Sequence, residues 1–336
     1  MINIKKSIKG IYLKLKYGVR VSSSDKVILI NIEENKFNRY LFPFVHMISS
    51  NGYKPILLLN FSQLAHLSYD KYQKMIFDRG LLFVTVKNMN IVKTINLSPD
   101  YFNALNNDSL RDSIIPMPMH PSIYSKGITI KNIIQNNKNI FFAGTTIGGV
   151  YNKRQVFEGI ISRFEVLDYI KTFKNSINVK SKNQFERLDL DKEKSYYMIY
   201  ERHNFNFTQE ELFIELTNNS FFLALPGTLM PLCHNIIEAM YCRAIPILQD
   251  VYAHMFPISL KDGVNCLIFK DFEELSNISK QIDQMTINDI ENMQNNVINY
   301  YKDYLSESAI TNKILTEGME KFYLQAEGHS VTLYNN

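Results

Sequence analysis

The stretch FFLALPGTLMPLCHNIIEAMYCRAIPIL, residues 221–248, decides the fold of the second half of the chain. Its apolar run Phe221–Leu225 predicts a buried strand that ends at the Pro226-Gly227 turn. The following residues predict a helix over Pro231–Arg243 and a second apolar strand over Ala244–Leu248. A strand, a helix and a strand in this order are typical of a parallel α/β sheet.

The predicted helix carries polar side chains on one face. His234 and Glu238 lie one helical turn apart and share that face, with Asn235 on the same arc. A helix N-terminus after a glycine-bearing turn offers unpaired N–H groups and a positive dipole, which suit a phosphate. We therefore expect Glu238 to accept from ribose hydroxyls and His234 to donate to phosphates. An ordinary crossover helix with a solvated polar face is the alternative.

Strands and helices alternate along the rest of the chain. In the first half we expect three strands, Lys26–Ile32, Pro55–Asn60 and Leu81–Val86. We also expect a helix over Phe37–Ser50 that ends in a left-handed cap at Asn51-Gly52. In the second half we expect three further strands, Asn139–Ala143, Tyr196–Tyr200 and Val264–Phe269, and a helix over Gln155–Phe173. Two more helices are expected to open with capping boxes, one formed by Thr208 with Glu211 and one by Asp271 with Glu274. The pattern predicts two Rossmann-like halves, although no GxGxxG fingerprint is present.

A proline cluster separates the two halves. Pro116, Pro118 and Pro121 stand close together, and proline does not fit central strands. We expect a first domain at 1–135, a second domain at 136–305, and a C-terminal tail at 306–336. The segment from Ile287 to Ala326, which includes most of this tail, is predicted to be largely helical.

Composition narrows the class of protein. The chain has 336 residues, 46% hydrophobic and 21% charged, which is ordinary for a globular protein. No apolar run approaches the ~20 residues that span a bilayer, and no signal peptide is visible, so a cytoplasmic location is expected. The three cysteines show no metal-ligand spacing, and no metal site is expected.

The first twenty residues hold six basic side chains and no acid, within a net charge of +4. Ile4, Ile8, Ile11 and Leu15 share one helical face there. Such a helix suits an anionic membrane surface and a peripheral place on the inner membrane. Packing on its own domain is the alternative. Nucleic-acid binding is not expected, because no basic surface interleaved with aromatics recurs elsewhere.

Residues 221–269 resemble the C-terminal domain of GT-B glycosyltransferases. The matching residues are Pro226, Gly227, Glu238, Ala239, Met240, Ala244, Ile245, Pro246 and Ile247, and Asp262–Leu267 is similar to the family's DGxNGLL turn. The resemblance implies an α/β fold of the GT-B type, in which two Rossmann-like domains face a cleft. It implies an acceptor domain at 1–135, a nucleotide-sugar-binding domain at 136–305, and a tail at 306–336 that crosses back to the first domain. It also implies that Glu238 contacts the donor ribose, while the Gly227-Thr228 turn and the helix start hold its phosphates.

The sequence departs from individual GT-B families. Pro231 replaces the first residue of a paired-glutamate motif, and His234 stands where exostosin-like families often carry arginine. Arg243-Ala244 replaces a usual glycine. The stretch from Phe141 also resembles exostosin- and fucosyltransferase-like second domains. In that comparison the donor-phosphate candidates are Arg154 and Arg163. Separately, Arg202-His203 follows a strand end, where the ligands of parallel sheets collect, so we expect this pair to contact the donor.

The resemblance implies transfer of a sugar from a nucleotide-sugar, which is a substrate, so no cofactor is expected. It also implies that the transfer needs no metal, because cationic side chains and a helix dipole stabilise the leaving phosphate. The Asn/Lys/Ile-rich composition is typical of AT-rich bacteria and favours a glycan or lipid-linked acceptor in capsule, O-antigen or lipooligosaccharide synthesis. For an inverting enzyme, His120 is the candidate base, ahead of His46 and His66; a retaining enzyme needs none. A sugar-nucleotide epimerase or hydrolase, or a non-catalytic carbohydrate-binding protein, are the alternatives.

Overall fold

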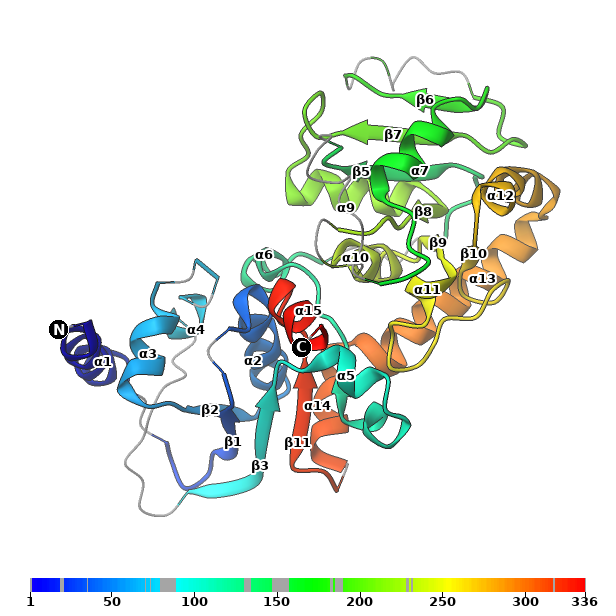
Figure 1. Cartoon of the computed structure of the whole chain (residues 1–336). Coiled ribbons are helices and arrows are strands. Elements are labelled where there is room, and N and C mark those ends of the chain that lie inside the picture. The colour runs from blue at the N-terminus through cyan, green and yellow to red at the C-terminus, as the bar shows by residue number, and fades with distance from the viewer. Residues whose placement is uncertain are drawn as a thin grey trace. The chain divides into compact units, whose positions relative to one another are not determined.

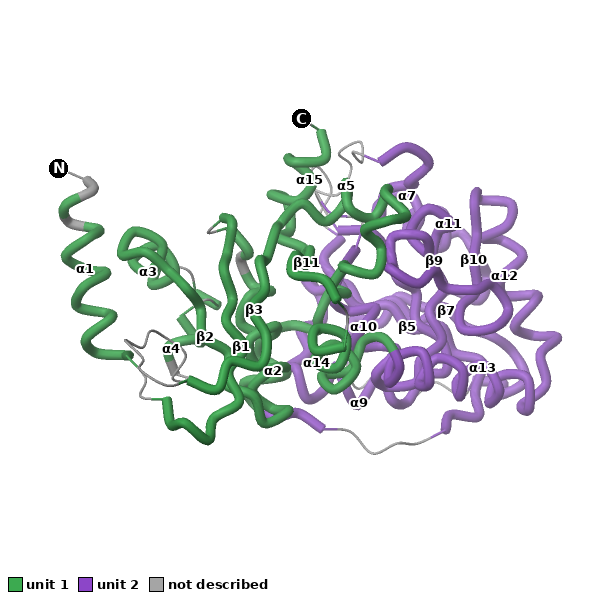
Figure 2. Tube along the Cα trace, turned by 90° about the horizontal axis from the view of Figure 1, so that it is seen from below, with its two compact units in different colours: residues 1–126, 304–336 green, residues 127–303 purple. Residues whose placement is uncertain are grey.

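The computed structural model divides the chain into two compact units. Unit 1 holds residues 1–126 and 304–336, and unit 2 holds residues 127–303 (Figure 2). The described residues are 2–18, 21–34, 36–69, 71–72, 74–78, 89–129, 134–146, 157–181, 184, 190–227, 230, 232–316 and 318–335. The sequence placed the unit boundaries at 135/136 and 305/306, and the structure places them at 126/127 and 303/304.

Unit 1 contains a parallel five-stranded sheet with the order β2-β1-β3-β11-β4 (Figure 1). Its strands are β1 (Lys26–Ile32), β2 (Lys54–Leu58), β3 (Asn90–Ser98), β4 (Ile114–Ile115) and β11 (Lys321–Leu324). The first two were expected, whereas the predicted strand Leu81–Val86 lies outside the described residues. The expectation of a helical segment to Ala326 is wrong at β11, which pairs with β3 and β4. Its four residues are too few to show the alternation of apolar and polar side chains that marks a strand in a sequence.

The helices of unit 1 pack around this sheet. They are α1 (Ile2–Tyr17), η1 (Asn38–Tyr40), α2 (Leu41–Ser50), α3 (Phe61–Leu67), α4 (Met75–Asp78), α5 (Tyr101–Leu105), η2 (Asp108–Ser113), α6 (Pro121–Lys126), α14 (Glu307–Thr316) and α15 (Gly328–Tyr334). The expected turn after α2 is confirmed, because Gly52 adopts a φ of 81°. The C-terminal α14 contacts α2, so the end of the chain completes the first unit.

Unit 2 contains a parallel six-stranded sheet with the order β10-β9-β8-β5-β7-β6. Its strands are β5 (Ile140–Gly144), β6 (Ser176–Asn178), β7 (Tyr197–Glu201), β8 (Phe221–Leu223), β9 (Ile245–Gln249) and β10 (Leu267–Phe269). Side chains of β7, β8 and β9 are buried throughout, as expected for a sheet that is covered on both faces.

Several helices surround the second sheet. They are α7 (Arg163–Ile170), α9 (Gln209–Asn218), α10 (Asn235–Tyr241), α11 (Asp250–Ala253), α12 (Phe272–Gln284) and α13 (Ile287–Tyr300), followed by the π-helical turn η3 (Tyr301–Leu305). The capping box of Thr208 with Glu211 is confirmed. Only half of the predicted box of Asp271 with Glu274 forms, because Asp271 accepts from Glu274 N while Glu274 accepts from Lys270 N. The predicted helix from Gln155 is wrong over 157–162, because the capping box of Ser162 with Glu165 starts α7.

Two parallel α/β units, the first completed by the C-terminal residues, confirm the α/β class and the two Rossmann-like halves that the sequence predicts. Each sheet forms the centre of its own apolar core. Among the described helices, none is both long and apolar enough to cross a membrane.

Candidate functional site

The strand order of unit 2 marks one place on its sheet for a ligand. The chain builds β6 and β7 on one side of β5, and then β8, β9 and β10 on the other. In open parallel sheets, ligands bind beyond the carboxyl ends of the strands at such a reversal. The residues that follow β5 and β8 are therefore the first to consider.

Arg163 joins these two strand ends. It is the first residue of α7, and only 6% of it is exposed. Its Nη1 donates to Thr145 O at 3.1 Å, just after β5, and its Nη2 donates to Leu225 O at 3.4 Å, just after β8. Nη2 also lies 3.5 Å from Cys233 Sγ. A fixed positive charge thus stands at the reversal, where it favours an anion.

The Pro-Gly turn after β8 brings main chain close to this guanidinium. Gly227 N donates to Met230 O at 2.8 Å. A Cβ at Gly227 would lie 2.7 Å from Met230 O and 3.1 Å from Cys233 Sγ, so a larger residue would displace the turn. The glycine found from the sequence is therefore required by close approach. Thr228 lies outside the described residues.

His234 and Glu238 form a pair at the start of α10. His234 Nδ1 lies 2.8 Å from Glu238 Oε1. The Glu238 side chain has no exposed surface, whereas 25% of the His234 side chain is exposed. The imidazole is therefore the member of the pair that reaches solvent, and Glu238 orients it from behind. Such a carboxylate fixes the tautomer and the orientation of the ring.

Helix α10 is shorter than its sequence predicts. The prediction began it at Pro231, whereas the structure begins it at Asn235 with His234 as the N-cap residue. Cys233 N donates instead to the buried Tyr252 hydroxyl at 2.6 Å, which fixes the segment that leads into the helix. Asn235 belongs to the first turn, and its Oδ1 is buried without a hydrogen bond among the described residues.

The end of β7 carries a buried polar network that sequence reasoning missed. Glu201 Oε1 accepts from Thr146 Oγ1 at 2.6 Å and from Lys171 Nζ at 2.8 Å, and Oε2 accepts from Asn178 Nδ2 at 2.8 Å. Burial would raise the pKa of Glu201, but these donors, led by Lys171, outweigh it and lower the pKa to about 2. A glutamate at the end of the apolar strand YMIYE was the only local signal.

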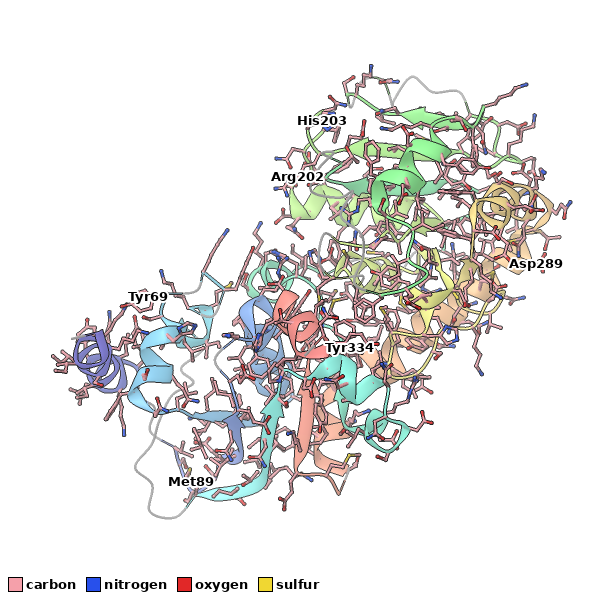
Figure 3. All side chains as sticks on the ribbon, in the orientation of Figure 1. Tyr69, Met89, Arg202, His203, Asp289 and Tyr334 are labelled. Atoms are coloured by element: carbon pink, nitrogen blue, oxygen red, sulfur yellow. The ribbon has the colours of Figure 1, made fainter. Side chains whose placement is uncertain are left out.

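Two predicted residues next to this network are solvent-exposed. Arg202 N donates to Gly144 O at 2.9 Å and extends the pairing of β7 with β5 by one residue. The Arg202 and His203 side chains lie in the turn after β7 (Figure 3). Arg154, the other predicted phosphate ligand, lies outside the described residues.

The predicted base in unit 1 is held by protein contacts. His120 Nδ1 lies 2.6 Å from Ser122 Oγ, and Nε2 lies 3.3 Å from the Tyr72 hydroxyl. Both ring nitrogens are therefore engaged within the protein. His46 lies 3.7 Å from Glu307 Oε1, and His66 is exposed on α3.

No protein-family model matches the sequence, and a search among curated proteins found no similar sequence. The crystal structure of Anabaena HepE in complex with UDP-glucose aligns with a TM-score of 0.41 and 10% identity, over 86% of this chain and 98% of HepE. The crystal structure of TarM aligns with a TM-score of 0.35 and 10% identity, over 82% of this chain and 58% of TarM. At 10% identity, these alignments compare folds and do not show the activity of this chain.

Proposed function

We propose that the protein is a glycosyltransferase that moves a sugar from a nucleotide-sugar to a hydroxyl acceptor. The observation that carries this proposal is the position of Arg163, whose guanidinium joins the carboxyl ends of β5 and β8 beside the Gly227 turn. The Glu-Ala-Met and Ile-Pro-Ile motifs that resemble GT-B enzymes follow the Gly227 turn in the sequence.

The donor's two parts have separate partners in this proposal. Its phosphates lie at the positive edge formed by Arg163 and the main chain around Gly227. Its ribose hydroxyls contact His234, and Glu238 acts through the imidazole because its own carboxylate is fully buried. Asn235 and Arg202 are further candidates for the nucleotide.

The reaction forms a bond between the acceptor oxygen and the anomeric carbon of the sugar. The bond from that carbon to the phosphate oxygen breaks, and its electron pair leaves with the nucleotide. The hydroxyl proton passes to a base or to the leaving phosphate. Fixed cations and N–H groups stabilise such a leaving group electrostatically, so the proposal needs no metal. A glycan or lipid-linked acceptor of bacterial surface polysaccharide synthesis, bound by unit 1, completes the proposal.

Ligand-observed NMR with UDP-glucose, GDP-mannose and a CMP-sugar tests the donor site. At least one should bind the wild-type chain, and His234→Ala should weaken that binding by roughly 10-fold, as expected for a lost hydrogen bond. His254→Ala is the matched control, because His254 also lies four residues from an acid, Asp250, in unit 2. Absence of binding by all three donors would refute the proposal, and unaltered binding by His234→Ala would refute the site.

The two alternatives predict different turnover of the same donors. An epimerase or hydrolase converts the donor at full rate without an acceptor, whereas a transferase accelerates when an acceptor is added. A non-catalytic carbohydrate-binding protein binds glycan and leaves every donor intact.

Helix α1 supports a further part of the proposal, contact with an anionic membrane surface. It packs on α3 through Gly10, where a Cβ would lie 2.2 Å from Phe61 O, and through the buried Leu13. Its apolar stripe is therefore left uncovered: Ile4 is 64%, Ile8 62% and Leu15 82% exposed. Lysines flank the stripe, and the first turn has no acid. An apolar face bordered by lysines is the chemistry of a helix that lies on anionic lipid.

Vesicle co-sedimentation tests this contact. The chain should bind vesicles of phosphatidylcholine with phosphatidylglycerol, and bind those of phosphatidylcholine alone more weakly. The double variant Ile8→Ser/Leu15→Ser should reduce binding at least ~10-fold, since two apolar side chains leave the lipid. Ile214→Ser is the control, because Ile214 is similarly exposed, at 57%, in unit 2. Equal binding by the double variant would refute the membrane contact.

A further inference from the structure

The sheet of unit 1 has its own reversal of strand order. The chain places β2 on one side of β1 and then β3, β11 and β4 on the other. All of these pairings are parallel, so the carboxyl ends of β1, β3 and β11 lie along one edge. The rule that marked the edge of unit 2 marks this one too, between β1 and β3.

A histidine–carboxylate pair stands at this edge. Glu34 comes two residues after β1, and His329 comes five residues after β11. His329 Nε2 lies 2.6 Å from Glu34 Oε2, with 13% of the histidine side chain and 40% of the glutamate side chain exposed. The carboxylate holds the proton on Nε2 and thereby makes Nδ1 a proton acceptor. Within the described residues, the bond to Glu34 is the one bond of this ring to a side chain.

The turn that presents His329 is fixed on both sides. Ser330 is fully buried, and its Oγ donates to Pro99 O at 2.6 Å, just after β3, and accepts from Ala326 N at 2.7 Å. Glu327 forms an ion pair with Arg39. The chain therefore ties the histidine to the ends of β3 and β11 and ties its partner glutamate to the end of β1.

This edge also retains two unfavourable features. Glu327 adopts φ 54° and ψ −135°, a region that residues with a side chain rarely occupy. Gln325 is fully buried, and neither its Oε1 nor its Nε2 has a hydrogen-bond partner among the described residues. Backbone strain and unsatisfied buried groups concentrate at functional sites, because packing alone does not favour them. Both lie within four residues of His329.

We propose that the Glu34–His329 pair is the site on unit 1 that binds and deprotonates a sugar hydroxyl. This inference rests on the proposed glycosyl transfer and names the residue that takes the acceptor's proton. The hydroxyl donates to His329 Nδ1, and its oxygen bonds to the anomeric carbon of the donor sugar. The proton moves to Nδ1, the bond to the phosphate oxygen breaks, and the electron pair leaves with the nucleotide. Glu34 stabilises the imidazolium that forms.

The pair fits this role better than His120 does. Both nitrogens of His120 are engaged, with Ser122 and with Tyr72, and it lies at the start of α6 rather than at the reversal. A base must have a nitrogen that can reach the hydroxyl. In His329, Nε2 is bonded to Glu34, and Nδ1 is the nitrogen that accepts the hydroxyl proton.

The first test follows the imidazole of His329 by NMR in the full chain. The resonance is assigned as the one that disappears in His329→Gln. Octyl β-glucoside, octyl β-galactoside and octyl N-acetyl-β-glucosaminide are the probes, added without a donor. At least one should shift the His329 resonance and leave that of His254, which lies in unit 2, in place. No shift with any of the three would overturn the proposal, whether or not the donor site binds nucleotides.

The second test measures turnover with a donor that binds. The acceptor is the probe that shifts His329, or water where donor hydrolysis is faster. His329→Gln should lower kcat by roughly 10²-fold or more, and leave donor binding unchanged, since general-base catalysis contributes about 10²–10⁴-fold. Glu34→Gln should lower kcat with little change in the acceptor KM, because the amide still accepts from Nε2 but does not balance the imidazolium charge.

Asp108→Asn is the control for Glu34→Gln, because its carboxylate is fully exposed in the same unit. Wild-type turnover in a folded His329→Gln or Glu34→Gln variant would overturn the proposal and leave the glycosyltransferase function standing. Failure of the wild-type chain to bind any donor would instead count against the proposed function. The two failures are therefore distinguishable.

Discussion

His234 Nδ1 lies 2.8 Å from Glu238 Oε1, and the carboxylate of this pair has no exposed surface. A ligand that approaches this side of α10 therefore contacts the imidazole, and Glu238 affects the ligand only by orienting that ring. The resemblance to GT-B enzymes predicts that Glu238 contacts the donor, whereas in the structure His234 is the accessible residue of the pair. Substitutions at the two residues should therefore have different effects on stability.

The first prediction concerns that separation. Glu238→Gln should retain the fold, because the amide oxygen still accepts from Nδ1, whereas Glu238→Ala should lower the free energy of unfolding by roughly 2–4 kcal/mol. His234→Ala should lower it less, by roughly 1–2 kcal/mol, because the partly exposed imidazole is little buried but the buried Glu238 Oε1 loses a hydrogen bond. Chemical denaturation measures the three variants. A His234→Ala loss as large as that of Glu238→Ala would show that the imidazole is structural.

Arg243 leads to a prediction about the end of α10. It adopts φ 64°, and the N–H groups of Arg243 and Ala244 donate to Met240 O and Ala239 O at 3.1 and 2.9 Å. This is the Schellman arrangement, whose left-handed position favours glycine. Arg243→Gly should therefore be more stable than Arg243→Ala by about 1 kcal/mol. Both variants lose the guanidinium bond to Asn295, so that contact does not enter the comparison, which thermal unfolding of the two measures.

The opposite order, with alanine the more stable, would contradict the left-handed assignment. The sequence had already marked this position, since the resembling families usually place glycine there. The structure supplies the reason in the sign of φ.

How far the sequence predicts the fold and the site depends on how local each feature is. Gly227, His234 and Glu238 lie in one strand–turn–helix segment, so their spacing alone brought them together. The exact start of α10 was not predictable, because Tyr252, from a later helix, accepts the bond of Cys233 N and fixes the preceding residues.

Features assembled from distant segments escaped the sequence. Glu34 and His329 stand 295 residues apart, and their meeting depends on β11 inserting beside β3. The Glu201 network similarly draws donors from three separate segments. A single sequence records periodicity within a segment, and carries no direct signal for which strand ends become neighbours.

Glu201 gives a prediction about acid stability. Its pKa falls from the ordinary 4.5 to about 2 in the folded chain, because hydrogen bonds from Lys171, Thr146 and Asn178 outweigh its burial. A lowered folded pKa stabilises the fold above the unfolded value, and that contribution disappears as the pH falls from about 4.5 to about 2. The free energy of unfolding should therefore decrease over this range.

Glu201→Gln should lower stability near neutral pH by roughly 2–4 kcal/mol, because Lys171 loses its buried partner. The variant should also show a shallower decline in acid than the wild type. Glu193→Gln is the control, since 82% of the Glu193 side chain is exposed. Equal acid slopes for wild type and Glu201→Gln, measured by urea unfolding at several pH values, would contradict the assignment.

The cysteines give a footprint of the donor site. Cys242 and Cys266 are 2% and 0% exposed, and burial raises the pKa of both thiols, so neither should react in the native chain. Cys233 is half-buried and lies 3.5 Å from Arg163 Nη2. A thiol reagent such as Ellman's should therefore modify one cysteine rapidly in the native protein and all three in denaturant. Cys233→Ser should remove the rapid phase, and Cys242→Ser should keep it.

A donor that occupies the edge between Arg163 and the Gly227 turn should slow this modification, because Cys233 Sγ lies close to both. The rate with saturating nucleotide-sugar should fall several-fold, while a free sugar without phosphate should have little effect, since it lacks the charge that Arg163 attracts. Modification at an unchanged rate by a nucleotide-sugar that binds would place the donor elsewhere on unit 2. Protection by the free sugar alone would favour a carbohydrate-binding role over glycosyl transfer.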